Sequence, residues 1–373
     1  MQFVFYISGH GFGHASRDIQ LIRTLADLAP EATVVVRTAA PRWLFDLSAP
    51  ASLDLQVFEA DTGIVQIDSL RLDEDETARR AAAFYRDFDR LADREAAWLT
   101  SGGPAVVLGD IPPLAFAAAH RAGIPSIAIG NFTWDWIYAA YPAFERIAAG
   151  VIPLIRDAYG RATRALRLPM HGGFETMMDV LRDIPFIARR SARDRHDTRL
   201  ALGISADRPA VLVSFGGSGV QLPLDVVART GGVTVVATGG PAVARPGDGA
   251  LVRIGERELY TRGFRYEDLV AAVDIVVSKP GYGIVSECVA NDTALLYTSR
   301  GRFVEYDLFV GEMPQVLRCR YVPQEDLLAG RWHHAIDALL RQPAPGGRPR
   351  IDGAVVASEE ILTLARRHAT ARS

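Results

Sequence analysis

The sequence predicts an α/β protein built from two Rossmann-like halves. Short apolar runs alternate along the chain with longer segments of helical period, which is typical of βα units around a parallel sheet. The pattern begins twice, because the apolar run 3–8 enters one glycine loop and the run 210–214 enters another. A polar, arginine-rich stretch at 189–199 separates the two series, so we expect domains at 1–195 and 196–373.

In the first half, apolar runs predict strands at 3–8, 32–36, 55–58, 105–108 and 126–129. An amphipathic helix follows the first glycine loop and reaches Leu28. Apolar residues at helical spacing predict further helices at 76–99, 112–122 and 146–166.

In the second half, the same reasoning predicts strands at 210–214, 233–238, 274–278 and 294–297, and a helix from about Ile284. The last helix, 354–368, is a candidate to cross back onto the first domain. Ligands of open parallel sheets bind beyond the carboxyl ends of the strands, so we expect the site in a cleft between two facing halves.

The composition is that of a soluble globular protein. With 373 residues, 49% of them hydrophobic and 23% charged, the chain is neither disordered nor fibrous. Its 41 basic and 44 acidic residues leave a formal net charge of −3, which gives no electrostatic reason to expect nucleic acid as a partner. No apolar run reaches the roughly 20 residues of a bilayer span, and the N-terminus lacks a signal-peptide pattern. We expect a cytoplasmic protein without an integral membrane segment.

The sequence does not predict a metal centre or a resident cofactor. The two cysteines, Cys288 and Cys319, have no Cys or His neighbours at the spacing of a zinc site. The acidic run 73–75 is interpreted as a solvated loop, and neither a Walker A nor an EF-hand sequence occurs.

The first glycine loop, at 8–17, lies between a strand and a helix, where glycines expose backbone amides to a ligand. Gly9, Gly11 and Gly13 have the spacing G-x-G-x-G, which fits a dinucleotide fingerprint poorly. The second strand ends at Arg37 and not at an acidic ribose partner. A dehydrogenase is therefore disfavoured, although Arg37 would suit a 2′-phosphate.

Two histidines in this loop indicate acid–base chemistry, because the pKa of an imidazole suits proton transfer near neutral pH. We interpret His14 as a general base that faces the cleft, and His10 as its neighbour; the alternative is that either one packs or caps the turn. Asp110 and Asp135 are both candidates for the orienting carboxylate. Asp110 has the rival role of capping the next helix.

Trp134, Trp136 and Tyr138 recur at every second residue after the strand at 126–129. Their flat faces suit contact with a sugar. An edge strand or ordinary core packing explains the same pattern, and both interpretations stay open.

The strongest local pattern is the segment 277–287, in which a strand ends in a Pro-Gly-x-Gly turn that opens a helix. Such a turn directs backbone amides and the positive helix end at an anion, as a diphosphate requires. Lys279, the only lysine of the chain, adds a positive charge there. Glu287 is placed to accept hydrogen bonds from ribose hydroxyls. The alternative is that it is a solvated carboxylate on the helix. Residues 216–218 form a second, weaker phosphate cradle.

These motifs, in this order and over the whole chain, resemble the GT-B nucleotide-sugar glycosyltransferases. The resemblance includes the undecaprenyl-linked N-acetylglucosaminyltransferases of cell-wall synthesis, and it is closer to the glycosyltransferase-like N-terminal region of plant L-arabinokinases. The segments that carry it are 9–17, 110–113, 131–138, 215–219 and 278–287. It implies an acceptor-binding first domain and a nucleotide-sugar-binding second domain.

The resemblance also assigns roles to matching residues. His14 matches the base that acts on the acceptor hydroxyl in inverting members, and Glu287 the ribose-binding carboxylate. Phe264 and Arg265, after a strand expected at 260–264, match the loop that reads the nucleotide base. Together, motifs and resemblance assign further donor contacts to Gly11, Gly13, Gly217, Ser218, Lys279, Gly281, Tyr282, Gly283, Arg302, Glu305 and Asp307, and acceptor contacts to His10, Phe12, Trp134, Asp135 and Trp136.

The expected function is a metal-independent, inverting glycosyltransferase that uses a nucleoside-diphosphate sugar, with UDP the favoured nucleotide, and a small-molecule or glycan acceptor. The donor-sugar loop departs from the family, because Glu305 and Asp307 are present without the usual glutamine. That departure keeps two alternatives open: a non-catalytic module that binds a nucleotide sugar or sugar phosphate, and a nucleotide-sugar epimerase or hydrolase. The sequence does not specify the sugar, the acceptor or the oligomeric state.

Overall fold

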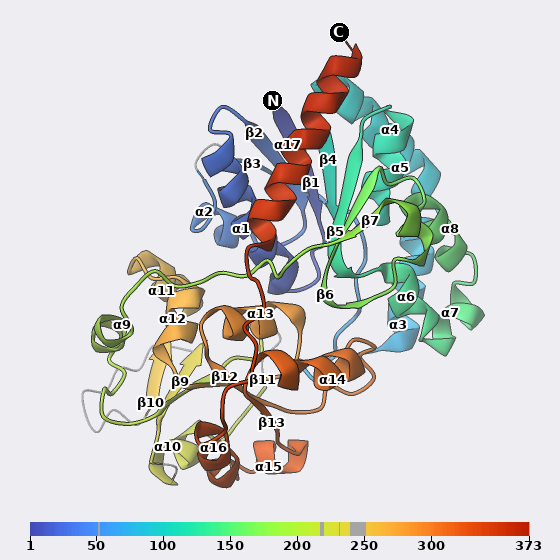
Figure 1. The fold of residues 1–373 in the computed structure, drawn as a ribbon. Helices are drawn as coiled ribbons and strands as arrows, with labels where there is room; N and C mark the ends of the chain where they lie inside the picture. Colours follow the sequence, from blue (N-terminus) through green and yellow to red (C-terminus); the bar gives the residue numbers. More distant parts are fainter. Residues whose placement is uncertain (51–52, 217–219, 231, 239–250, 373) are drawn as a thin grey trace. The chain divides into compact units, whose positions relative to one another are not determined.

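The computed structural model describes residues 1–50, 53–216, 220–230, 232–238 and 251–372. The chain divides into two compact units (Figure 1). Unit 1 comprises 1–65, 72–187 and 350–373, and unit 2 comprises 66–71 and 188–349. The division differs from a single boundary at 195/196, because the chain enters unit 2 at Ala188 and returns to unit 1 at Arg350.

Unit 1 is built on a seven-stranded sheet whose strand pairs are all parallel, in the order β3-β2-β1-β4-β5-β6-β7. The strands are β1 (Gln2–Ile7), β2 (Thr33–Thr38), β3 (Leu53–Val57), β4 (Val106–Asp110), β5 (Ser126–Phe132), β6 (Arg164–Gly172) and β7 (Leu181–Asp183). The helices are α1 (Phe12–Leu28), α2 (Arg42–Asp46), α3 (Glu74–Tyr85), α4 (Phe88–Gly102), α5 (Pro113–Arg121), α6 (Trp134–Ala139), α7 (Pro142–Ile147), α8 (Val151–Tyr159), the 3-10 helix η1 (Glu175–Val180) and α17 (Gly353–Arg372).

Unit 2 has a six-stranded parallel sheet in the order β10-β9-β8-β11-β12-β13. Its strands are β8 (Ala210–Val213), β9 (Thr234–Thr238), β10 (Leu251–Ile254), β11 (Ile275–Ser278), β12 (Ala294–Tyr297) and β13 (Cys319–Tyr321). Its helices are α9 (Arg195–Leu202), α10 (Leu224–Thr230), α11 (Glu256–Thr261), α12 (Tyr266–Ala272), α13 (Tyr282–Ala290), α14 (Tyr306–Val316), α15 (Gln324–Leu328) and α16 (His333–Leu340).

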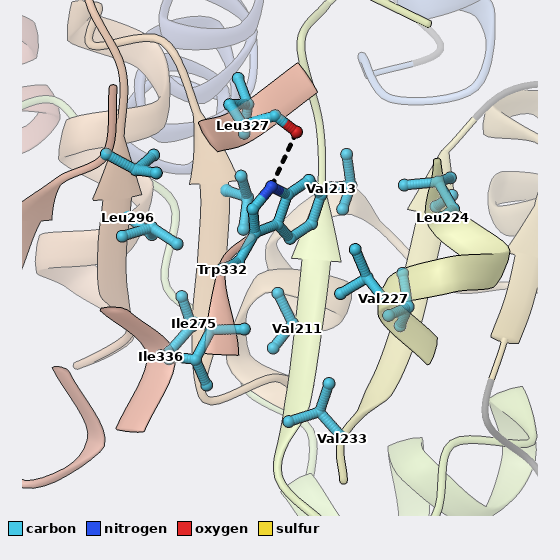
Figure 2. Packing of buried hydrophobic residues seen from close by; sticks show 14 of the residues in the cluster. Val211, Val213, Leu224, Val227, Val233, Ile275, Leu296, Leu327, Trp332 and Ile336 are labelled. Atoms are coloured by element: carbon cyan, nitrogen blue, oxygen red, sulfur yellow. Dashed lines mark hydrogen bonds between the residues drawn. The ribbon is translucent and has the colours of Figure 1, made fainter. Parts of the chain in front are cut away.

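Both sheets are held by buried apolar side chains. In unit 2, Trp332 is fully buried among Val213, Leu296 and other aliphatic residues of the strands, as Figure 2 shows. Its indole Nε1 donates a hydrogen bond of 2.8 Å to the carbonyl of Leu327, so the polar atom of this large ring is satisfied inside the core. In unit 1, Val4, Tyr6 and Val107 of the strands form the corresponding core with residues of α4 and α5.

Two segments belong to a different unit from the residues that flank them in sequence, and the second is the last helix, which was a candidate to cross back. Residues 66–71 belong to unit 2, where Leu70 is part of the core and the Ser69 hydroxyl donates to the carbonyl of Phe215 at 2.8 Å. The last helix, α17, packs along α1 in unit 1 (Figure 1). None of the helices in the described part of the chain is long and apolar enough to cross a membrane.

Several predicted elements were wrong in type or extent. The single helix expected at 76–99 is two helices, α3 and α4, which break between Tyr85 and Phe88. The helix expected at 146–166 covers the end of α7 and all of α8, which ends at Tyr159. Strand β6 follows with alternating buried Leu166, Leu168 and Met170, a period-two pattern that the helical interpretation overlooked. No strand forms at 260–264: helix α11, whose first turn is closed by the Gly255 amide donating to Glu258, ends at Thr261, and a turn follows at 262–263.

Candidate active site

The first candidate site lies at the carboxyl edge of the unit 1 sheet. Strands β1 and β4 are parallel neighbours with Ile7 opposite Asp110, and the Ser8 amide donates to the Asp110 carbonyl at 2.8 Å. The glycine loop turns the chain at Gly11, whose φ of +75° is a conformation that favours glycine, and α1 begins at the next residue. This arrangement brings the start of α1 beside the end of β4.

His14, in the first turn of α1, is hydrogen-bonded through Nδ1 to Asp110 Oδ1 at 2.8 Å. Both side chains are buried, with 6% and 2% of their surface exposed. A carboxylate can only accept, so this contact favours the tautomer that carries hydrogen on Nδ1 and leaves a lone pair on Nε2. A buried imidazole held this way is suited to remove a proton from a ligand.

Arg17, one turn further along α1, holds the same carboxylate. Its Nε donates to Asp110 Oδ2 at 2.5 Å, its Nη2 donates to Oδ1, and its Nη1 donates to the Asn131 side chain at 2.9 Å. Burial by itself raises the pKa of Asp110, but the charges of Arg17 and His14 outweigh it and lower that pKa well below its usual range. Asp110 is therefore ionised, and of the two candidate carboxylates it is the one that contacts His14; it does not cap α5, whose N-cap is Pro112.

Two further buried carboxyl groups lie near this pair. Burial, and then the charge of Asp110, raise the pKa of Asp18 well above its ordinary value. Burial also raises the pKa of Asp61 to about 6, against a 2.8 Å hydrogen bond from the Trp134 indole and a 3.0 Å one from the Ser8 hydroxyl. We name His14, Arg17, Asp18, Asp61, Asp110 and Asn131 the histidine cluster.

The aromatic residues expected to face an acceptor are largely internal. Trp134 is fully buried and stacks on Tyr138 with ring centroids 5.5 Å apart. Trp136 is half-buried, and its ring lies where a side chain at Gly172 would stand. Asp135 is buried and accepts a hydrogen bond of 3.1 Å from Arg156, so it does not orient His14.

The other two acceptor candidates remain on the loop surface. His10 is half-buried; its Nδ1 accepts from the Ile64 amide at 3.3 Å and its ring meets Trp134 edge-on. Phe12 is half-buried and meets Trp43 edge-on at 6.0 Å between ring centroids. His10 therefore packs within the loop, whereas the Phe12 ring stays partly exposed.

The second candidate site is the glycine turn of unit 2, between β11 and α13. Gly281 is the N-cap of α13, Tyr282 is buried in its first residue position, and Gly283 follows. Arg300, which follows β12, brings its Nη1 to 3.9 Å from the point where a Cβ on Gly281 would lie. The Arg300 guanidinium stacks on Phe303 at 3.7 Å from the ring centroid.

Lys279 lies in this turn, close enough to Arg300 to be affected by its charge. Burial, and then the charge of Arg300, lower the pKa of Lys279 to about 7, while Glu305 opposes the shift. Two positive charges at the amino end of a helix repel each other, and a bound anion would stabilise both. We name Lys279, Gly281, Tyr282, Gly283 and Arg300 the cation turn.

Glu287 lies one turn further along α13 and is 4% exposed. Arg189 Nε donates to its Oε1 at 2.6 Å, and Oε2 has no hydrogen-bond partner among the described residues. Burial raises the pKa of Glu287 to about 7, although Arg189 lowers it and Glu267 raises it further. The solvated helix carboxylate that served as the alternative is therefore excluded.

The remaining donor candidates lie around the same sheet. Phe264 is buried under the Arg193 guanidinium, which stands 4.7 Å from its ring centroid, and the Arg265 amide donates to Asp268 to begin α12. Glu305 is the half-buried N-cap of α14, whereas Arg302 and Asp307 are exposed. Gly217 and Ser218 lie outside the described residues. Gly11 and Gly13 belong to the first loop in unit 1.

Sequence reasoning missed Arg17, Asp18, Asp61 and Asn131 in unit 1, and Arg189, Glu267 and Arg300 in unit 2. Arg17 and Asp18 follow His14 by three and four residues, which places all three on one face of a helix and was a usable signal. The others reach their sites from distant segments. No cluster of three or more potential metal ligands occurs in the parts of the chain described above.

Comparison with known proteins gives relatives of two kinds and no matching family profile. The chain is 31% identical to the L-arabinokinase of Arabidopsis thaliana over 347 residues, which is 88% of this chain and 31% of that protein. It is 28% identical over 186 residues to the UDP-N-acetylglucosamine–N-acetylmuramyl-(pentapeptide) pyrophosphoryl-undecaprenol N-acetylglucosamine transferase of Clavibacter michiganensis, covering 49% of this chain and 47% of that one. The chain thus spans about a third of the first relative and about half of the second.

Solved structures share the fold along nearly the whole chain. The calicheamicin glycosyltransferase CalG4 aligns with a TM-score of 0.58 at 14% identity, covering 99% of this chain and 94% of that one. The glycosyltransferase VinC in complex with dTDP gives 0.55 at 14% identity, with 98% and 95% covered. Arabidopsis thaliana UGT89C1 complexed with UDP gives 0.55 at 16% identity, with 97% and 99% covered. The resemblance and the fold class predicted from the sequence are confirmed.

Proposed function

We propose that this chain, which has the GT-B fold of the glycosyltransferases, moves a sugar from a nucleoside-diphosphate sugar to the hydroxyl group of an acceptor. The observation that carries the proposal is the buried hydrogen bond between His14 and the ionised Asp110 at the carboxyl edge of the unit 1 sheet. It supplies a base with a free Nε2 lone pair where parallel sheets bind ligands.

The proposed reaction is a single displacement. Nε2 of His14 takes the proton of the acceptor hydroxyl as the acceptor oxygen bonds to the anomeric carbon of the donor. The bond from that carbon to the nucleoside diphosphate breaks, and the diphosphate leaves with the electron pair. Asp110 stabilises the imidazolium that forms. Attack opposite to the leaving group inverts the configuration of the anomeric carbon.

The cation turn is the proposed site of the donor diphosphate. Lys279, Arg300 and the amino end of α13 supply positive charge for the leaving group, the part that a metal ion plays in other enzymes. Glu287 would accept ribose hydroxyls through Oε2, and Phe264 and Arg265 would contact the base. UDP is the proposed nucleotide, because the Clavibacter relative is named for a UDP-sugar and UGT89C1 was solved with UDP.

The test is a transfer assay with a panel of nucleoside-diphosphate sugars and acceptors, in which mass spectrometry detects the product. His14→Ala should reduce transfer by about 10²–10⁴-fold, the usual contribution of a general base. His120→Ala is the matched control, because His120 is an exposed histidine of the same unit. Equal transfer by the His14→Ala and wild-type proteins would show that the role given to His14 is wrong.

A second candidate function is a module that binds the nucleotide sugar without transferring it. Arg17 favours this alternative, because its Nη2 lies 3.0 Å from His14 Nδ1 and, as a donor, favours the opposite tautomer, in which Nε2 carries the hydrogen and has no lone pair for the acceptor proton. The absence of the usual glutamine beside Glu305 favours it as well. Tight binding of one nucleotide sugar that stays intact with every acceptor would identify such a module.

A further inference from the structure

The carboxylate of Glu287 belongs to a buried three-residue cluster. Arg189 stands between Glu287, at 2.6 Å from Nε, and Glu267, at 3.4 Å from Nη1, and all three side chains are about 95% buried. A guanidinium is planar and offers its donors in a fixed fork, so two carboxylates on different edges hold it in one orientation. Arg189 in turn holds Glu287 by a single oxygen, Oε1.

The backbone of Arg189 is fixed as firmly as its side chain. Asn291, at the end of α13, donates from Nδ2 to the Arg189 carbonyl at 2.9 Å and accepts from the Ser191 amide at 2.9 Å. The Ser191 hydroxyl donates to Asp268 of α12 at 2.6 Å. The segment through which the chain enters unit 2 is therefore tied to the same helix that carries Glu287.

The second oxygen of Glu287 has no hydrogen-bond partner in the described part of the protein. Oε2 is buried and without a hydrogen bond among the residues that the structure describes, although Oε1 is satisfied. A buried carboxylate oxygen left in this state is unfavourable unless a ligand supplies the donor. One such oxygen has lone pairs for two donors, which matches the two adjacent hydroxyl groups of a ribose.

We propose that Arg189 is a positioning residue of the nucleotide site, which fixes Glu287 so that Oε2 receives both hydroxyls of a ribose and thereby selects ribonucleoside diphosphates over their 2′-deoxy counterparts. The inference rests on the proposed function, because it assumes that unit 2 binds a nucleoside diphosphate. It goes further by naming Arg189, a residue whose side chain contacts Glu287 and not the substrate, and by predicting discrimination against 2′-deoxy nucleotides.

The experiment measures dissociation constants by calorimetry for the four ribonucleoside diphosphates and their 2′-deoxy forms. For the base that binds best, the affinity of the ribose form is divided by that of the deoxy form, and this ratio is compared between variants. In the wild-type protein the ratio should be about tenfold or more in favour of ribose, since the deoxy form leaves one acceptor position unfilled. Glu287→Gln and Arg189→Met should each reduce the ratio to about one or two. The double variant should reduce it no further.

Matched variants separate positioning from stability. Arg199→Met removes another buried unit 2 arginine, which pairs with Asp274 at 2.8 Å, and should leave the ratio unchanged. Arg189→Lys keeps the charge in case Arg189→Met does not fold, and its single ammonium should give a ratio below that of the wild type. Melting temperatures of all variants report folding.

The inference is overturned if Arg189→Met keeps the wild-type ratio while Glu287→Gln loses it. If Arg189→Met does not fold, Arg189→Lys takes its place in this comparison. It is also overturned if Arg199→Met lowers the ratio equally, since that would show a general effect of stability. Failure of all eight nucleotides to bind would overturn the proposed function itself, and a wild-type ratio of one would overturn ribose recognition by Glu287.

Discussion

Replacing Lys279 with methionine removes a titrating cation from the cation turn and should abolish one pH dependence of donor binding. Without ligand, burial first and the charge of Arg300 second lower the pKa of Lys279 to about 7, and Glu305 opposes them. A bound diphosphate places negative charge beside the ammonium group and should return its pKa toward the ordinary value of about 10.4. Above pH 7, binding therefore requires the uptake of a proton.

The magnitude follows from the difference between the two pKa values. The free site holds the proton below pH 7 and loses it above, whereas the bound site keeps it to about pH 10. The contribution of Lys279 to affinity falls by about tenfold for each pH unit above 7, or about 1.4 kcal/mol, and by about a hundredfold between pH 6 and pH 9. At pH 8, about 0.9 proton should be taken up with each donor molecule.

Glu287 acts in the opposite direction over the same range. Its pKa, raised to about 7, means that it ionises between pH 6 and pH 8 and becomes a better acceptor for ribose hydroxyls as the pH rises. The wild-type profile is therefore the sum of two opposed effects. The ratio of wild-type to Lys279→Met affinity cancels the part that belongs to Glu287.

The assay is calorimetric titration with UDP-N-acetylglucosamine at several pH values, in two buffers of different ionisation enthalpy. The affinity ratio of wild-type to Lys279→Met protein should fall by about a hundredfold from pH 6 to pH 9. Arg320→Met, which removes an exposed cation of the same unit, should keep the wild-type profile. A ratio that does not change with pH, with no difference in heat between the buffers, would show that Lys279 takes up no proton when the donor binds.

Two further variants test buried interactions, one beside His14 in unit 1 and one in the core of unit 2. Asp110→Asn should lower transfer by about 10²–10⁴-fold and the free energy of unfolding by about 3–5 kcal/mol, because it disorders His14 and removes the buried carboxylate charge that Arg17 contacts. Steady-state assays and urea denaturation measure both effects, and Asp183→Asn, at an exposed ion pair, should change stability by no more than about 1 kcal/mol. Trp332→Ala should lower the free energy of unfolding by about 3–5 kcal/mol, since the ring is fully buried; a loss below about 1 kcal/mol in the same titration would contradict the core described here.

The local pattern of the chain predicted the elements that carry the two sites. The segment around His14 and the segment from Lys279 to Glu287 each join an apolar strand, a glycine turn and a helix, and all three signals lie within a few residues. The edge strands β7, β10 and β13 and the strand β6 were missed. The three edge strands are too short to show a clear period, whereas the alternating buried residues of β6 closely follow the helix that ends at Tyr159, and the predicted helix extended into them.

The partners of the site residues were not predictable in the same way. Asp110 meets His14 only because β4 pairs with β1 in a register that sets Asp110 opposite Ile7. Arg189 meets Glu287 across 98 residues of sequence. No local pattern encodes such contacts, because they depend on which strands become neighbours. The residues with chemical function could be proposed from the sequence, whereas those that hold them in place required the structure.

We propose that His14 removes the proton of the acceptor during sugar transfer, and a single-turnover experiment isolates this step. Enzyme in excess is loaded with a bound nucleotide sugar, mixed with acceptor, and followed by mass spectrometry for the loss of donor and the gain of product. We predict that His14→Ala binds the donor as tightly as the wild type and transfers the sugar at least a hundredfold more slowly. An equal rate of transfer, or a wild-type protein whose bound donor stays intact, would contradict the account.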